Sequence, residues 1–301
     1  MSKASTRFIA PEVLARISSL ELLARGVVEG FIAGLHRSPY KGFSVDFMEY
    51  RPYLPGDDLQ RVDWKLFARS DRYFVKEFEG ETNVRLHLVV DISSSMGYAS
   101  GKITKREYAF FLAASLAYLM IRQRDAVGLT LFDDRIRRSV PARSSKGHLH
   151  TILTQLERAK PGTDTSFGRP LHEVAEQQRR RGFVVLLSDL LSDPDALVNA
   201  LKHFRFNGHD VLVFHILDPQ EVYFEFTDMV EFEDMESGEK LLVEAERAKT
   251  LYQENFARFH ERLRKECGLL GIDYVLLETS RPLDHALFNY LSSRARRGEY
   301  R

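Results

Sequence analysis

The chain has 301 residues, of which 44% are hydrophobic and 29% are charged. This mixture is typical of a folded globular protein and excludes an intrinsically disordered one. Lysine plus arginine and aspartate plus glutamate number 43 each, so no overall positive charge attracts nucleic acid or an anionic membrane surface. At this length we expect one large domain or a core domain with a smaller attached module.

Cys267 is the only cysteine, which excludes an intrachain disulfide and favours a reducing compartment. No stretch reaches the roughly 20 apolar residues that a membrane-spanning helix requires, and residues 1–7 lack the apolar core of a signal peptide. We therefore expect a cytoplasmic protein without a membrane span. The arginine-rich stretches at 179–181 and 294–297 fit solvated helix ends better than phosphate-binding patches, so we expect no nucleic-acid partner.

The beginning of the chain combines a helical segment with a strand-like one. Residues 10–24 carry apolar side chains at helical spacing, which predicts an amphipathic opening helix. Aromatic segments of short period at residues 45–50 and 73–78 predict two strands. A Pro-Gly pair between them is typical of a type II turn. We therefore expect residues 1–82 to form a helix and a small β-rich module.

From residue 83 the pattern alternates between strand-like and helical segments, which predicts parallel strands joined by crossover helices. Apolar runs at residues 183–187 and 211–217 predict buried central strands. We expect residues 83–301 to form an α/β domain with a mostly parallel sheet flanked by helices, and an acidic insertion near residues 221–239 with a hairpin turn at residues 234–239. Further strands are expected at residues 85–90, 126–132 and 272–277, and helices at 105–123, 146–156, 168–180, 194–206, 249–266 and 283–294.

A hydroxyl-rich loop follows the first core strand. Asp91, Ser93 and Ser95 stand at alternate positions directly after it, and open parallel sheets bind ligands at the carboxyl ends of their strands. Alternate side chains of an extended loop point the same way, so these three offer hard oxygen ligands of the kind that magnesium prefers. Taken alone, the loop is explained equally well by helix capping, for which serine and aspartate are favoured.

Two later segments supply further oxygen atoms. Thr163 lies in a polar loop before a predicted helix, with Thr165 as its alternative, and Asp189 ends the most apolar strand. With these added, the pattern favours a metal site over helix capping, because each residue supplies an oxygen of suitable hardness. The residues expected to hold one Mg²⁺ or Mn²⁺ ion are Asp91, Ser93, Ser95, Thr163 and Asp189.

These three segments, in this order, resemble the metal-ion-dependent adhesion site of von Willebrand factor A domains. Those domains have an Asp-x-Ser-x-Ser loop, a later threonine and a later strand-terminal aspartate. The resemblance implies a Rossmann-like core in which Ser93, Ser95 and Thr163 contact the ion, while Asp91 and Asp189 act through water. Where such domains often have glycine after the last aspartate, this chain has Leu190, a departure that affects the loop shape more than the ligand.

The stretch before the core carries the motifs Glu-Tyr-Arg-Pro-Tyr-Leu-Pro-Gly-Asp-Asp at residues 49–58, Val-Asp-Trp at 62–64, Ala-Arg at 68–69 and Val-Lys-Glu-Phe-Glu at 75–79. It is similar to the bacterial domain-of-unknown-function 58 family, and with the core the resemblance spans roughly residues 40–217. Members of that family are commonly associated with MoxR-type AAA+ ATPases, which implies such a partner. The mixed charges of this stretch form either a binding surface or, as we expect, ion pairs that brace it onto the core, and we expect Trp64 to anchor its packing.

The sequence offers little for catalysis. It has no Gly-x-Ser-x-Gly elbow and no phosphate-binding Gly-x-x-x-x-Gly-Lys loop, and Ser93 stands where an aspartyl phosphatase has its second aspartate. His148 and His150 lack a cysteine or carboxylate at zinc-ligand spacing, which favours surface or packing roles. We expect a metal-dependent interaction module that binds an acidic protein ligand and assists a MoxR-type ATPase in a chaperone-like or assembly role. A metal-assisted hydrolase and a scaffold with an incidental metal are the alternatives.

Overall fold

The computed structural model describes residues 11–14, 19–37, 50–52, 74–76, 85–162, 168–178, 180–235 and 238–298. Its centre is a six-stranded sheet with the strand order β10-β7-β6-β3-β4-β5. Neighbouring strands run parallel except at the edge, where β5 pairs with β4 in the antiparallel direction. The strands are β3 (Arg85–Asp91), β4 (Ala126–Phe132), β5 (Ile136–Arg143), β6 (Phe183–Ser188), β7 (Asp210–Leu217) and β10 (Asp273–Glu278).

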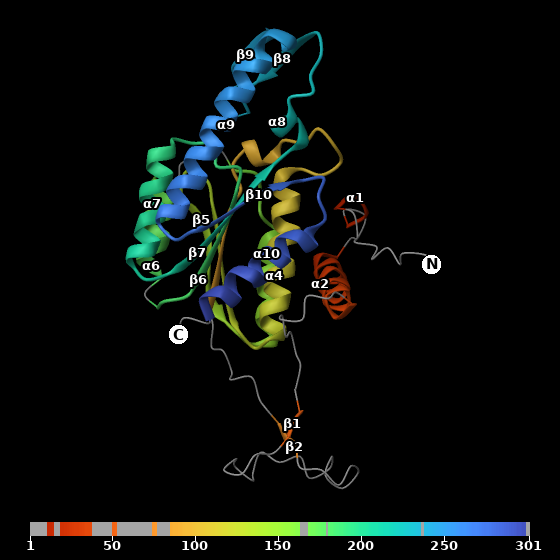
Figure 1. Cartoon of the computed structure of the whole chain (residues 1–301), viewed down its shortest axis with the longest axis vertical. Helices are drawn as coiled ribbons and strands as arrows, with labels where there is room; N and C mark the ends of the chain where they lie inside the picture. Colours follow the sequence, from red (N-terminus) through yellow and green to blue (C-terminus); the bar gives the residue numbers. More distant parts are fainter. Residues whose placement is uncertain are drawn as a thin grey trace.

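Helices cover both faces of this sheet (Figure 1). One hydrophobic core contains residues of α2 (Leu20–Arg37), α4 (Lys105–Arg122), α5 (Lys146–Glu157) and α10 (Leu283–Gly298). A second core contains residues of α6 (Gly168–Gln177), α7 (Pro194–Phe206) and α9 (Ala245–Leu269). Along β3, Leu88 and Val90 enter the first core and Val89 the second, as the alternation of side chains in a strand requires. The predicted α/β architecture with a mostly parallel sheet is confirmed.

Local signals fix where the central helices begin. Thr104 and Glu107 form a reciprocal capping box at the start of α4, in which each side chain accepts a hydrogen bond from the other residue's backbone N–H. The side chain of Asp193 caps α7 by accepting hydrogen bonds from the backbone N–H groups of Asp195 and Ala196, and Pro194 occupies the first helical position. Both helices therefore begin at the residues that the sequence predicts, 105 and 194.

The opening helix differs from its prediction. The described residues form a short helix α1 (Pro11–Leu14) and the longer α2, which continues well beyond the predicted end at residue 24. The reason is that Val28, Phe31 and Ile32 extend the apolar face and are buried in the same core as α4. The opening of the chain thus contributes directly to the core. The division into two domains at residue 82 stays a prediction.

Two small antiparallel pairs of strands lie outside the central sheet. β1 (Tyr50–Pro52) and β2 (Phe74–Lys76) pair in the antiparallel direction. β2 lies inside the predicted strand at residues 73–78, whereas the predicted strand at 45–50 lies outside the described residues except for Tyr50. The Pro-Gly turn, Trp64 and the charged motifs between them lie outside the described residues. The acidic segment forms α8 (Pro219–Tyr223) and a hairpin of β8 (Met229–Glu233) and β9 (Lys240–Glu244), which confirms the predicted hairpin.

Single side chains behave largely as expected. His148 is buried and its Nε2 lies 2.8 Å from the carbonyl oxygen of Val127, which fits the predicted packing role, and His150 is exposed at the surface. Cys267 is buried, and burial raises the pKa of its thiol to about 12. Within the parts of the chain that are described, no helix is both long enough and apolar enough to cross a bilayer.

Candidate metal-binding site

The carboxyl ends of β3 and β6 meet at the point where the strand order reverses. β3 has β4 on one side and β6 on the other, so the chain first builds toward one edge of the sheet and later toward the opposite edge. In open α/β sheets this reversal marks the place where ligands bind. Asp91 is the last residue of β3, and Asp189 directly follows β6. The sheet therefore brings these two aspartates, 98 positions apart in the sequence, to one site.

Asp91 is fully buried and is held by two donors. The backbone N–H of Ser93 donates to its Oδ1 at 2.9 Å, and the hydroxyl of Ser188 donates to its Oδ2 at 2.6 Å. Burial, and secondarily the negative charge of Asp189, nevertheless raises the pKa of Asp91 to about 7. The hydrogen bonds from the side chain of Ser188 and from the backbone and side chain of Ser93 act in the opposite direction but do not offset these effects. Positive charge placed here would therefore stabilise the ionised carboxylate.

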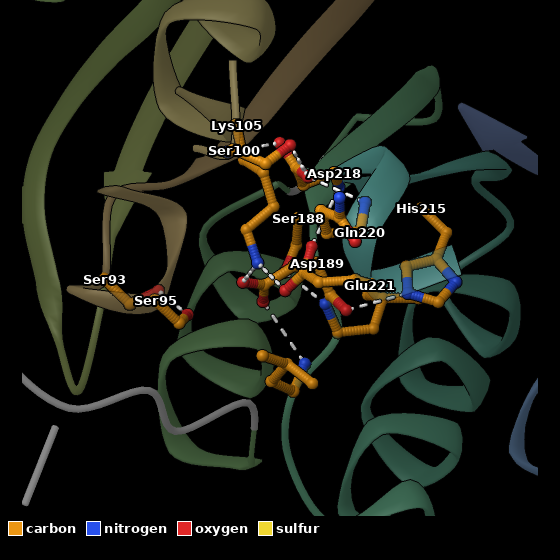
Figure 2. A network of polar contacts seen from close by, with 12 residues as sticks. Ser93, Ser95, Ser100, Lys105, Ser188, Asp189, His215, Asp218, Gln220 and Glu221 are labelled. Carbon is orange, nitrogen blue, oxygen red and sulfur yellow. Dashed lines mark hydrogen bonds and ion pairs between the residues drawn. The ribbon is translucent and has the colours of Figure 1, made fainter. Parts of the chain in front are cut away.

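The hydroxyls of Ser93 and Ser95 converge beside this carboxylate. Their Oγ atoms are joined by a 3.1 Å hydrogen bond, and both residues are buried. In an octahedral Mg²⁺ site, bonds of about 2.0–2.1 Å put adjacent ligand oxygens about 2.8–3.0 Å apart. The hydroxyls are therefore close to the spacing of two neighbouring ligands, and in Figure 2 the two side chains lie side by side on their loop.

Helix capping does not account for this loop. The short helix η2 (Ser95–Gly97) has Ser94 at its N-cap position, and that side chain makes no capping hydrogen bond. The next helix, α4, is capped by Thr104 instead. Neither Ser93 nor Ser95 thus occupies the position in which a serine caps a helix.

Thr163 and its alternative Thr165 lie outside the described residues. The residue before Thr163 is described, however. The N–H of Gly162 donates to the carbonyl oxygen of Ile92 at 2.7 Å, so this loop runs against the segment between Asp91 and Ser93. A side chain at position 162 would collide with the carboxylate of Asp133 and lie 2.9 Å from the Ile92 carbonyl oxygen. Glycine is therefore needed for the close approach of the two loops.

Lys105 is the site residue that the sequence did not reveal. Its ammonium lies 2.8 Å from Oδ2 of Asp189 and 2.6 Å from Oε1 of Glu221, and its side chain is 0% exposed. Figure 2 shows it reaching from the start of α4 toward both carboxylates. Burial by itself would lower the pKa of Lys105, but the charges of Asp189 and Glu221 raise the pKa above its usual value. Both carboxylates therefore favour the charged form of Lys105.

His215 supports Asp189 from the neighbouring strand β7. Its Nε2 lies 2.8 Å from the carbonyl oxygen of Asp189, and its Nδ1 is hydrogen-bonded to the hydroxyl of Tyr274. Since a carbonyl oxygen can only accept, Nε2 carries the proton and Nδ1 accepts from the tyrosine. Burial lowers the pKa of His215 to about 3, so the ring stays neutral. The imidazole thus positions the backbone of Asp189 and adds no charge.

The donor set suits a hard cation. Within the described residues no three or more His, Cys, Asp or Glu side chains are grouped as a metal cluster, so an ion at this site would depend on serine hydroxyls as well as on Asp91. Hydroxyl and carboxylate oxygens are ligands for Mg²⁺ or Mn²⁺ and not for a soft metal. The arrangement of Asp91, Ser93 and Ser95 fits such an ion, whereas Asp189 is already engaged by Lys105.

Comparisons with known proteins give distant relatives. An uncharacterised protein of Mycobacterium tuberculosis is 29% identical over 233 residues, which cover 76% of this chain and 72% of the relative. An aerotolerance-related membrane protein from Bacteroides fragilis has a similar structure, with a TM-score of 0.48, 19% identity, and coverage of 69% of this chain and 98% of that one. The conserved hypothetical protein BatB from Bacteroides thetaiotaomicron has a TM-score of 0.47 and 16% identity, covering 71% and 99% of the two chains.

The family described as "Protein of unknown function DUF58" matches residues 49–266. That range includes Asp91, Ser93, Ser95, Asp189 and both carboxylate partners of Lys105. It covers well over half of the 301 residues, and the chain belongs to this family.

Proposed function

We propose that this chain is a metal-dependent protein-interaction module with a von Willebrand factor A-like, Rossmann-like core. The observation that supports it most is the pair of buried hydroxyls, Ser93 and Ser95, 3.1 Å apart beside the buried carboxylate of Asp91 at the strand-order reversal. The residues that would hold one Mg²⁺ or Mn²⁺ ion are Asp91, Ser93, Ser95, Thr163 and Asp189.

The chemistry of the site follows from the charges of its ligands. Ser93, Ser95 and Thr163 are neutral, so direct contact with these hydroxyls leaves most of the charge of a divalent ion unneutralised. When bound, the ion supplies an electrophilic position that a carboxylate fills better than water does. Asp91 accepts a hydrogen bond from the N–H of Ser93 and so orients the loop, and it acts on the ion through water. An aspartate or glutamate of a partner protein is therefore the ligand that this site would select.

The proposed partner is a MoxR-type AAA+ ATPase or a protein that such an ATPase handles. The membership of the chain in its family, together with the absence of a phosphate-binding loop from its sequence, supports a division of labour in which the ATPase supplies the nucleotide chemistry. The balance of charges argues against a nucleic-acid partner, and the proposal places the module in the cytoplasm.

Affinity capture from extracts of cells that contain the protein tests this function. The immobilised chain should retain an ATPase or another protein with an acidic surface when Mg²⁺ is present, and should release it when a chelator is added. The Asp91→Ala variant should retain no such protein even in Mg²⁺. Metal-dependent turnover in a panel of phosphate and ester substrates would instead favour the metal-assisted hydrolase. Capture that is the same with metal, with chelator and with Asp91→Ala would favour the scaffold and contradict the proposal.

A further inference from the structure

The position of Lys105 is unusual for a lysine in the first turn of a helix. Lysine side chains normally extend to water, even from partly buried positions. Here the ammonium and the carboxylate of Asp189 are both 0% exposed, and the side chain of Glu221 is 20% exposed. Burying these charges is costly unless they are paired with good geometry. The fold therefore holds a cation at this place, next to the loop proposed to bind a metal ion.

We propose that Lys105 is an internal counter-ion that competes with the divalent cation for Asp189 and thereby sets the metal affinity of the site. This inference rests on the proposed function. Both oxygens of Asp189 are engaged, because Oδ2 accepts from Lys105 at 2.8 Å and Oδ1 accepts from the N–H of Leu191 at 3.2 Å. A cation that draws on Asp189 must weaken the contact to Lys105, and the ammonium also repels it.

Glu221 is placed to receive the ammonium when Asp189 turns to the metal ion. Its Oε1 already lies 2.6 Å from the ammonium, and its Oε2 accepts the N–H of Asp218 at 2.8 Å. The carboxylate of Asp218 in turn accepts hydrogen bonds from the N–H and the hydroxyl of Ser100. Glu221 is thus fixed by contacts that do not involve Asp189, so Lys105 keeps a partner in both states.

This arrangement gives the site two charge states with the same buried lysine. Without metal, one ammonium is shared by Asp189 and Glu221. With metal, the carboxylate of Asp189 interacts with the ion, and the ammonium of Lys105 keeps its ion pair with Glu221. Because metal binding weakens the contact between Lys105 and Asp189, that contact lowers the affinity of the site for the ion. A carboxylate from a partner protein then supplies the additional binding energy that full occupancy requires. The same link connects the metal site to α8, the helix that carries Glu221.

The first test is a calorimetric titration of the full chain with Mg²⁺, comparing wild type, Lys105→Gln and Lys102→Gln. Lys102 is exposed and three positions away, so its variant makes the same change in net charge where water screens it. We expect Lys105→Gln to bind Mg²⁺ at least about tenfold more tightly than wild type, which corresponds to removing about 1.4 kcal/mol of opposition. Lys102→Gln should bind like wild type.

The second test uses only the wild-type chain, so it does not depend on whether a variant at position 105 folds. The side-chain ammonium of a buried, ion-paired lysine can be followed by ¹⁵N NMR, and the Lys105 signal of the wild-type chain should shift and saturate as Mg²⁺ is added. An unchanged Lys105 signal at saturating Mg²⁺ would overturn the inference.

The outcomes separate this inference from the proposed function. Lys105→Gln binding no more tightly than Lys102→Gln, while wild type binds Mg²⁺, would reject the competing role of Lys105 and leave the metal site standing. Binding by Lys105→Gln but not by wild type would support the competition and contradict metal occupancy in the unmodified chain. Absence of Mg²⁺ binding from all three proteins would overturn both proposals.

Discussion

The hydroxyl of Ser188 donates a 2.6 Å hydrogen bond to Oδ2 of Asp91, and this contact ties the carboxyl end of β6 to that of β3. Both residues are fully buried, so neither can replace the bond with one to water. The bond also leaves Oδ1 to the backbone N–H of Ser93. Ser188 thereby fixes the carboxylate around which the serine loop is arranged.

Loss of this contact should be measurable as a loss of stability. Ser188→Ala removes a hydrogen bond to a buried carboxylate, and we expect the free energy of unfolding to fall by about 1.5–3 kcal/mol at pH 8. Urea denaturation measures this free energy of unfolding. Ser139→Ala, on the exposed face of β5, should change the same quantity by less than about 0.5 kcal/mol. Equal stability of the two variants would show that Asp91 does not depend on Ser188.

Two glycines form a matched pair for the loop that precedes Thr163. Gly162→Ala places a methyl group against Asp133 and the Ile92 carbonyl, and we expect it to cost about 1–3 kcal/mol of unfolding free energy. Gly147→Ala has open space around it within α5 and should be neutral or stabilise by up to about 1 kcal/mol. Thermal melting of both variants compares them. A Gly162→Ala variant as stable as Gly147→Ala would contradict the close approach of the two loops.

His87 should make the protein sensitive to mild acid. Burial, and secondarily the charge of His209, lowers the pKa of His87 to about 4, whereas an unfolded histidine titrates near about 6.5. Below that pH the unfolded chain takes up a proton that the folded chain does not, so stability falls as pH drops from about 6.5 to about 4, by about 1.4 kcal/mol per pH unit. His87→Gln can keep the bond to Thr130 and should flatten this slope in denaturant titrations. Parallel pH profiles for wild type and variant would contradict the assignment.

If the proposed function holds, the purified chain should not hydrolyse ATP but should alter the ATPase rate of a MoxR-type partner, because its sequence lacks the Gly-x-x-x-x-Gly-Lys loop with which such ATPases bind phosphate. A coupled phosphate-release assay with each protein alone and with both together checks this. Asp91→Ala should abolish the effect on the partner. ATP hydrolysis by the chain alone, equal in wild type and Asp91→Ala and lost on denaturation, would reveal a nucleotide site elsewhere.

Much of the fold is predictable from apolar pattern alone. The run at residues 183–187 is apolar throughout because β6 is covered on both faces, and such a strand has no exposed positions to interrupt it. Asp189 stands out because it ends that run. The sequence did not reveal β5, whose residues between Ile136 and Val140 are polar and exposed. An edge strand of this kind has no buried face strong enough to give an alternating pattern.

The part of the site that sequence reasoning missed depends on contacts over long separations. Lys105 is the first residue of α4, a position in which a lysine is usually solvated, and only the folded sheet brings Asp189 and Glu221, 84 and 116 positions away, to its ammonium. Glu221 lies in α8, within the segment predicted to be an acidic insertion, and its side chain is mostly buried. Asp91, Ser93 and Ser95 could be predicted together because they lie within five residues of one another. Their lysine neighbour could not.

The most direct measurement is the binding of Mg²⁺ to the wild-type chain and to a Ser93→Ala, Ser95→Ala double variant, followed by isothermal titration calorimetry. Ser139→Ala serves as the control for loss of a serine hydroxyl. The account predicts one ion bound by wild type and by Ser139→Ala, with longer-bonded Ca²⁺ a poor substitute, and no binding by the double variant while its fold is retained in circular dichroism. A wild-type chain that binds no Mg²⁺, or a double variant that binds it equally well, would contradict the claim that this loop is a metal site.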